Sequence, residues 1–226
     1  YIMKNIVKNS MLISLITQFF TFIIGIFMQF KNVSNIHYIL KYALGLENIV
    51  QFIEGSFYLW FSYFSNKNID KIDIAKYRYY DWFFTTPTMI LSTIIFFEYN
   101  NSIKNNNILT FKKFIYNNYY KIIELFSYNF FMLFFGYLQE INIINIFIST
   151  FFGFIFFYLL FYKIYTYFTI YSKKNYKIFY FMLFIWYLYG FAAMFSFKIK
   201  NTLYNILDIF SKNFYGLFLA YIIYKL

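Results

Sequence analysis

The sequence predicts an all-α fold, a bundle of seven transmembrane helices in a single domain spanning residues 1–226. Three observations predict it. Of the 226 residues, 62% are apolar and only 13% are charged, which is about half the charged fraction of an average soluble domain. One proline and seven glycines supply few of the turns that an all-β fold needs. Seven apolar runs each approach the ~20 residues that cross about 30 Å of hydrocarbon.

We expect the helices, in chain order, at residues 11–30, 42–64, 77–97, 122–138, 143–162, 178–197 and 202–224. The first run is long and lacks the small-residue cleavage site of a signal peptide, so we interpret it as a helix of the bundle. Lysines are more numerous in the connections 31–41, 98–121 and 163–177 and at the C-terminus than in the other connections. This bias favours an N-terminus outside and a C-terminus in the cytoplasm.

The first two helices each carry polar residues at helical spacing. Gln18 lies on such a stripe in 11–30, and the stripe in 42–64 consists of Glu47, Gln51, Glu54 and Tyr58. Two carboxylates deep in an apolar helix are costly and are rarely needed for packing alone. Two interpretations stay open: hydrogen bonds that hold helices together, or a hydrated path whose acids favour cations.

The third helix carries a longer polar stripe. Arg78, Asp81, Thr85 and Ser92 share one face over some four turns. A carboxylate on this stripe is suited to pair with a cation from another helix. Pro87 lies within the same helix, where membrane proteins tolerate it.

The fourth, fifth and sixth helices are mainly aromatic and aliphatic, as expected of lipid-facing surface. The acids of these helices and of the loops are interpreted as having no functional role. Glu124 begins the helix 122–138, where a negative charge is stabilised by the positive end of the helix dipole. Solvated positions at helix ends or in loops are expected for Glu98, Glu140, Asp70, Asp73 and His37.

The seventh helix contains Asp208 and Lys212, four residues apart and therefore on one face, with Asn205 close to that face. From this helix alone, two interpretations are equally good. The pair is either a buried salt bridge that fixes packing or a reactive lysine beside its counter-ion.

Composition excludes several functions. The chain has no cysteine and a single histidine, so we expect no disulfide, no metal site and no catalytic triad, and we do not expect an enzyme. The net charge is +11, but the lysines lie in short clusters between apolar runs. That pattern is typical of loops that touch anionic lipid headgroups and does not indicate nucleic-acid binding.

Two motifs resemble those of the microbial rhodopsins. The family's R-Y-x-D-W-x-x-T-T-P motif is matched by residues 78–87, and its D-x-x-x-K motif by residues 208–212. The resemblance implies that Lys212 carries all-trans retinal as a protonated Schiff base. It implies counter-ions at Asp81, which would also accept the proton, and at Asp208. The counter-ion network that it implies includes Arg78, Thr85 and Ser211.

The resemblance also implies a pocket for the retinal. Its expected residues are Trp82, Thr86, Met132, Gly136, Trp186 and Tyr189. The chain departs from the family at Gly190, where the family has proline, and at Ala193, where it has tryptophan. These departures affect the shape of the pocket around the retinal ring.

The acceptor, middle and donor positions of the family read Asp81, Thr85 and Ser92. Outward proton pumps usually have a carboxylate at the third position, and serine cannot reprotonate the Schiff base at neutral pH. The polar residues are similar to those of the group-one viral rhodopsins, which are light-gated cation channels of large algal viruses. On this resemblance the ion path and its gates consist of Gln18, Glu47, Gln51, Glu54, Ser92, Asn205 and Asn213.

The expected function is therefore a retinal-binding, light-gated cation channel in a membrane, a host-cell membrane if the protein is viral. The alternatives are a light-driven outward proton pump and a sensory photoreceptor that signals to a partner protein. We expect membrane lipid and permeant cations as partners. A monomer and a homo-oligomer stay open.

Overall fold

The computed structural model describes residues 2–68, 74–105 and 107–226, so the expectations for Asp70 and Asp73 lie outside the described residues. In this part of the chain the secondary structure is helical, without strands. The longer helices are α1 (Ile2–Gln29), α2 (Ile39–Asn68), α3 (Ile74–Lys104), α4 (Phe111–Glu140), α5 (Ile146–Ile164), α6 (Lys173–Ala192), α7 (Phe197–Asp208) and α8 (Tyr215–Lys225). A short 3-10 helix, η1 (Asn35–His37), precedes α2.

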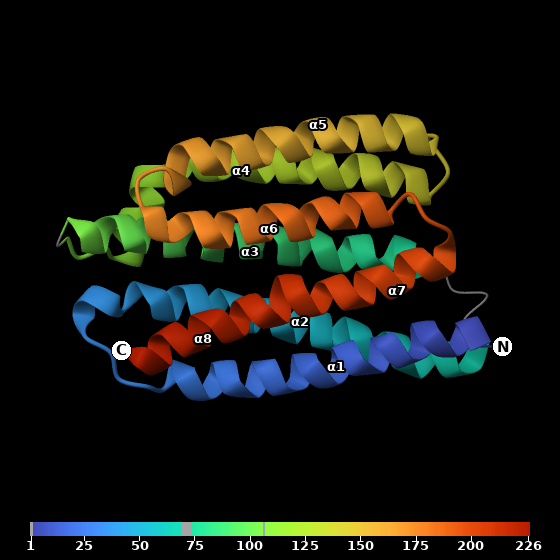
Figure 1. The fold of residues 1–226 in the computed structure, drawn as a ribbon, viewed down its shortest axis with the longest axis horizontal. Coiled ribbons are helices and arrows are strands. Elements are labelled where there is room, and N and C mark those ends of the chain that lie inside the picture. Colours follow the sequence, from blue (N-terminus) through green and yellow to red (C-terminus); the bar gives the residue numbers. More distant parts are fainter. Residues whose placement is uncertain (1, 69–73, 106) are drawn as a thin grey trace.

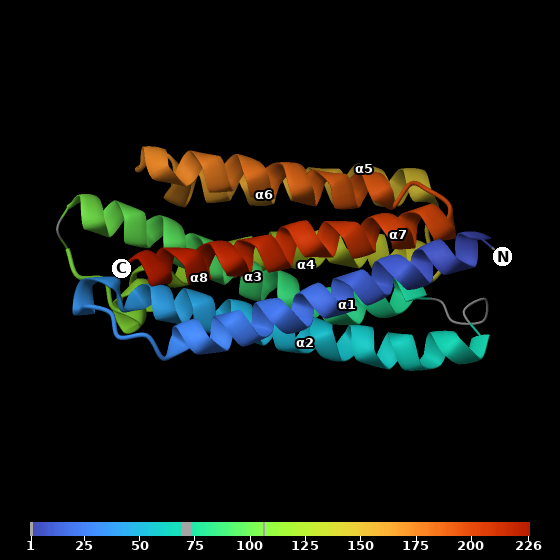
Figure 2. The ribbon, with the colours of Figure 1, turned by 60° about the horizontal axis from the view of Figure 1, so that its bottom comes forward.

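Two π-helical segments join these elements into seven rods. The segment η3 (Tyr165–Thr169) continues α5, and η4 (Ile209–Phe214) joins α7 to α8. The rods lie side by side along one axis, with the N- and C-termini at opposite ends (Figures 1 and 2). We call these ends of the bundle the N end and the C end. The rod α7–η4–α8 contacts α1, α2, α3 and α6, and its face towards these helices is buried.

The seven predicted helices are all present, but their ends differ from the prediction. Helix α4 begins at Phe111 because Thr110 caps it, accepting a hydrogen bond from the backbone N–H of Lys113. Its first turns are rich in Lys, Asn and Tyr, so hydropathy alone did not reveal them. Helix α6 ends at Ala192 and α7 already begins at Phe197. The turn between them is apolar, and for that reason the sequence pattern ran across it.

The distribution of side chains is that of a membrane protein. Large apolar side chains cover the outside, and Phe27, Phe147 and Tyr158 are each more than half exposed. Polar and charged side chains, including Arg78 and Lys212, are buried inside. Lipid favours this arrangement because it solvates apolar surface and cannot solvate unpaired polar groups.

Four stretches are long and apolar enough to cross a membrane by length and composition: Ile6–Gln29, Phe111–Glu140, Ile146–Thr169 and Phe197–Lys225. Helices α2, α3 and α6 have 30, 31 and 20 residues, so they reach across a bilayer by length. They are less apolar because α2 and α3 carry the polar stripes and α6 begins with lysines and is rich in tyrosine.

Three minor expectations are corrected. Glu124 lies well inside α4 rather than at its start, and its carboxylate pairs with the Lys163 ammonium at 2.8 Å. Glu140 is buried rather than solvated, because the end of α4 meets the start of α7 and Lys200 pairs with it. His37 is partly buried, with its Nδ1 2.7 Å from the Tyr99 hydroxyl.

Candidate functional site

The interior of the bundle is organised around Lys212, whose side chain is 2% exposed. Its ammonium nitrogen lies 2.7 Å from Glu54 Oε1, 3.1 Å from Asp81 Oδ2 and 3.4 Å from Asp208 Oδ1. The three carboxylates come from α2, α3 and α7, so three helices converge on one nitrogen. A buried charge of this kind is tolerated only when it is paired.

Asp208 is the most fully hydrogen-bonded carboxylate of this cluster. The hydroxyls of Tyr58 and Tyr189 each donate to it at 2.6 Å, one to each carboxylate oxygen. Arg78 adds an ion pair at 3.1 Å. Asp81 differs, because its Oδ1 has no hydrogen-bond partner among the described residues. The two predicted counter-ions therefore have unequal surroundings. Both oxygens of Asp208 accept hydrogen bonds, whereas Asp81 Oδ1 accepts none from the described residues.

Arg78 links this cluster to the N end of the bundle. Its guanidinium donates to the side-chain oxygens of Asn201 and Asn205 on α7. Asn205 in turn donates to the Ser10 hydroxyl on α1 at 2.9 Å. Hydrogen bonds thus join α1, α3 and α7 on this side of Lys212.

The local backbone of Lys212 is unusual. It lies within the π-helical segment η4, where the hydrogen-bond pattern differs from that of an α-helix. Its carbonyl oxygen accepts a hydrogen bond from the Gln51 amide at 3.0 Å. The predicted path residue Gln51 is therefore anchored to the backbone at the lysine itself.

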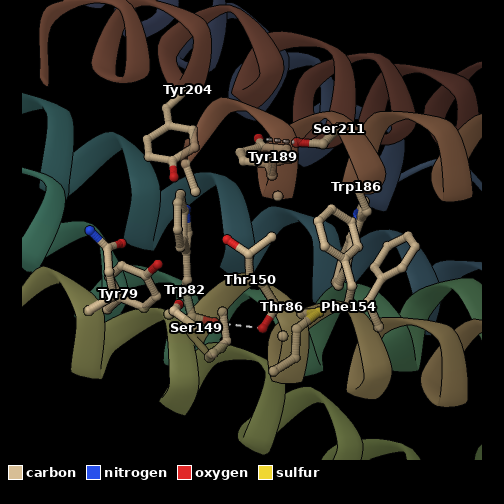
Figure 3. A pocket seen from close by; sticks show the side chains of 18 of the residues that line it. Tyr79, Trp82, Thr86, Ser149, Thr150, Phe154, Trp186, Tyr189, Tyr204 and Ser211 are labelled. Carbon is tan, nitrogen blue, oxygen red and sulfur yellow. Dashed lines mark hydrogen bonds between the residues drawn. The ribbon is translucent and has the colours of Figure 1, made fainter. Parts of the chain in front are cut away.

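A cavity of about 900 Å³, including its open mouth, adjoins Lys212. All six predicted pocket residues line it, together with Ser211 and Lys212. Trp82 and Trp186 stand on two sides of this space, with Thr150 directed between them (Figure 3). At the Lys212 end, the hydroxyls of Tyr189 and Ser211 lie 2.8 Å apart (Figure 3).

Aromatic contacts fix the position of Trp82. Its ring makes edge contacts with Tyr79, Tyr189 and Tyr204, at centroid distances of 5.0, 5.6 and 4.9 Å. Gly136 is equally constrained, because a Cβ at this position would lie 2.4 Å from the Tyr79 hydroxyl oxygen. The wall of the cavity is therefore closely packed where α3 meets α4.

Sequence reasoning missed several residues of this cavity. Tyr204 could have been found, because it lies four residues before Asp208 and shares its helical face. Thr150, Gly153 and Phe154 on α5 gave no signal, since their helix reads as uniform lipid-facing surface. Tyr79 lies within the R-Y-x-D-W motif but was not assigned to the pocket.

The predicted path residues divide into two groups. Gln18 donates to Glu54, and Ser92 donates to Glu47, so each predicted carboxylate on α2 has a partner on another helix. Asn213 is buried, and neither its amide nitrogen nor its amide oxygen has a partner among the described residues. Thr85 was predicted for the counter-ion network and not for the path; its hydroxyl donates at 3.0 Å to the Asp81 backbone oxygen, a contact within α3.

The arrangement of a buried lysine, several carboxylates and an adjoining aromatic cavity is matched by a known family. A family model described as bacteriorhodopsin-like protein covers residues 9–226. The chain belongs to this family. A search of curated protein sequences finds no match.

Solved structures of the family share the fold. The viral rhodopsin OLPVRII is 26% identical, with a TM-score of 0.83 over 97% of this chain and 98% of the other. Xanthorhodopsin, described as a light-driven ion pump with dual chromophore, is 17% identical, with a TM-score of 0.75 over 98% and 93% of the two chains. Exiguobacterium sibiricum rhodopsin is 14% identical, with a TM-score of 0.76 over 98% and 96%. The chain is thus a microbial rhodopsin similar to a viral rhodopsin.

The bacteriorhodopsin-like family binds retinal, and the residues of this chain fit that group. A primary amine at one end of a long cavity suits attachment of an aldehyde. The two tryptophans and Met132 provide an apolar lining for a polyene. Gly136 leaves room that a larger residue would fill. The spare oxygen of Asp81 beside the lysine offers an acceptor where such a group would carry charge.

Proposed function

We propose that the chain is a light-gated cation channel, acting as one domain of seven helices with all-trans retinal bound to Lys212. When bound, retinal in Schiff-base linkage supplies light absorption and isomerisation. The residues of the chain supply the rest: Lys212 attaches the group, Asp81 and Asp208 balance its charge, and Trp82 and Trp186 confine it.

The two aspartates have different roles in this proposal. Asp208 is held by two tyrosine hydroxyls and Arg78, so its negative charge is stabilised where it stands. Asp81 Oδ2 lies 3.1 Å from the lysine nitrogen, while its Oδ1 lacks a donor. Asp81 is therefore the better placed of the two to accept a proton from that nitrogen.

The path is supported by a single observation, which carries the proposal. Among the described residues, several of the buried polar atoms without a hydrogen-bond partner lie on α1, α2 and η4, and others lie on α3, α4 and α8. Those considered for the path belong to Ser14, Gln18, Thr21, Glu47, Gln51 and Asn213. Buried polar groups are normally satisfied, so unpaired ones in this number call for internal water.

The helices that carry these atoms contact one another, since η4 packs against both α1 and α2. Just after η4, a Cβ on Gly216 of α8 would lie 3.2 Å from the Gln51 amide nitrogen and 3.4 Å from Thr21 Cγ2. Water at this interface would extend from Lys212 towards Glu47 and the C end. A path lined by carboxylates favours cations over anions by charge. The closed state is maintained by the contacts of Glu54 with Gln18 and Lys212.

A photocurrent under voltage clamp tests the proposal. A channel dissipates a gradient, so its current reverses near the equilibrium potential of the permeant cation and follows that potential when the bath cation is changed. We expect this reversal. A current that stays outward at all voltages and ignores the cation gradient would contradict the channel.

One observation favours an outward proton pump as the second candidate. Ser92 occupies the position at which outward proton pumps usually have the carboxylate that donates a proton. Its hydroxyl donates a hydrogen bond to the Glu47 carboxylate, so α2 supplies a carboxylate next to this position of α3. Glu47 could then return a proton from the C end. In a pump, Glu47→Gln slows the recovery of the pigment and lowers a current that does not reverse. In a channel, the same variant changes conductance or cation preference while the current still reverses.

We further propose that the N end faces outside and the C end the cytoplasm, on the basis of the lysine distribution. The composition and the likeness to a viral rhodopsin support a host-cell membrane as the location. Membrane lipid and permeant cations are the partners of this function, with the oligomeric state open.

A further inference from the structure

The cavity beside Lys212 is open on one side, between the first turns of α5 and the last turns of α6. The residues that line it there are small and partly exposed: Thr150, Gly153, Gly190 and Ala193. The residues deeper in the cavity, such as Trp186 and Lys212, are buried. The opening therefore leads from the surface of the bundle to the interior.

The surface around this opening is apolar. Phe147 and Phe151 on α5 are 82% and 63% exposed. Phe191 in the last turn of α6 is 45% exposed, and Met194 just after this helix is 49% exposed. Such side chains face hydrocarbon in a membrane protein. A molecule that passes the opening therefore arrives from the lipid and not from water.

Packed side chains close the cavity towards both ends of the bundle. Towards the N end, Tyr79 and Tyr204 are buried against Trp82, and the buried pair Glu140–Lys200 joins α4 to α7. Towards the C end, the main hydrophobic core fills the interior, including Met89, Phe157, Phe161 and Phe179. The lateral opening is thus the route to Lys212 that packed side chains leave unfilled.

Two glycines shape the opening. Gly153 has empty space beside it, since a Cβ there would meet no atom within 4 Å. At Gly190 the reverse holds: a Cβ would lie 2.9 Å from Phe154 Cζ, so this glycine makes room for the Phe154 ring. Phe154 is the bulky side chain at the mouth, with its ring also 5.5 Å from that of Tyr187.

We infer that the gap between α5 and α6 at Gly153 and Gly190 is a lateral portal through which a lipid-dissolved retinoid enters the site. The inference rests on the proposed function, because it assumes that retinal is the ligand. Gly153 keeps the portal open, and the Phe154 ring, seated over Gly190, narrows it.

The test measures how fast the pigment forms. Retinal-free protein in phosphatidylcholine vesicles is mixed with all-trans retinal, and visible absorbance is followed in time, each trace normalised to its own end point. Gly153→Leu and Gly153→Phe fill space that no atom occupies, and we expect the rate constant to fall with side-chain size, at least about tenfold for Phe. Phe154→Ala widens the mouth, and we expect it to accelerate formation. Ile155→Phe, on the lipid-facing side of α5, is the matched control and should keep the wild-type rate.

The outcomes separate the portal from the proposed function. Wild-type rates in both Gly153→Leu and Phe154→Ala, with pigment formed, would overturn the portal alone. Equal slowing by Ile155→Phe would also overturn it, because the effect would then be general to α5. If a Gly153 variant does not fold, acceleration by Phe154→Ala supports the portal and its absence contradicts it. No pigment in the wild type would overturn the retinal site itself.

Discussion

Neutralising Glu54 should cost little stability, although its carboxylate has the shortest contact with Lys212. The cluster holds two cations, Lys212 and Arg78, and three carboxylates, Glu54, Asp81 and Asp208. At 2.7 Å and an effective dielectric constant of ~20, the attraction between Glu54 and Lys212 is about 6 kcal/mol. Glu54→Gln removes this attraction but also removes the repulsion between Glu54 and the two aspartates.

That repulsion can be bounded from the same contacts. Since all three carboxylates touch one nitrogen, the interacting oxygens of Glu54 and Asp208, and those of Glu54 and Asp81, are at most about 6 Å apart. At the same dielectric constant, each pair repels by about 3 kcal/mol or more. Together the two repulsions are at least about as large as the lost attraction, so Glu54→Gln should lower the free energy of unfolding by no more than about 1 kcal/mol.

Lys212→Met should behave differently, because it leaves three carboxylates without their shared cation. Removing one partner of a buried ion pair costs about 3–5 kcal/mol. The assay is equilibrium unfolding of retinal-free protein in mixed micelles with rising dodecyl sulfate, followed by circular dichroism. Phe147→Leu, at an 82% exposed position, is the control. If Glu54→Gln lost as much stability as Lys212→Met, the excess of negative charge would be refuted, and Glu54 and Lys212 would form an ordinary pair.

The remaining predictions concern colour and current. Lys212→Ala should abolish visible absorbance after retinal is added, since no other described lysine nitrogen lies in this cluster; a coloured pigment would contradict the assignment. Asp81→Asn should shift the absorption to the red, because a lost counter-ion no longer stabilises the ground state, and an unchanged spectrum would exclude Asp81 from that role. Glu47→Gln should leave the pigment formed and alter the conductance or cation preference, measured by voltage clamp. Asn213→Ala should change the closing rate of the current after the light is switched off, and wild-type closing would reduce Asn213 to packing.

The spacing of polar residues within each helix, together with the two motifs, was enough to predict which side chains gather around Lys212. Asp81 and Asp208 were predicted as partners of Lys212 from spacing and motif. Their carboxylates lie 3.1 and 3.4 Å from the lysine nitrogen. Glu54 was predicted only as a path residue, yet its carboxylate also contacts that nitrogen. The face of a helix can be read from its own residues, but the depth at which it meets another helix depends on packing across the bundle.

The same reason explains the errors. Glu140 looked solvated because its partner Lys200 belongs to a distant part of the chain, and only the meeting of α4 and α7 brings the two charges together. Gly153 gave no signal because the meaning of a glycine in an apolar helix depends on what lies opposite it. The ends of helices were predicted wrongly where the turn between two helices is itself apolar, as between α6 and α7.

The π-helical segment at Lys212 has a consequence for the rod that it interrupts. A π turn holds about one residue more than an α turn. The residues after it are therefore rotated by about 100° about the helix axis, compared with an uninterrupted α-helix of the same sequence. Tyr215, Leu219 and Ile223 are the buried side chains whose direction depends on this segment. Regular winding of the unchanged sequence would rotate α8 by about 100° about the rod axis while α7 kept its orientation. Deleting a single residue from 209–214 would instead allow regular winding and leave α8 close to its present orientation. The lysine thus lies at the one point of the rod where the register of its two halves is set.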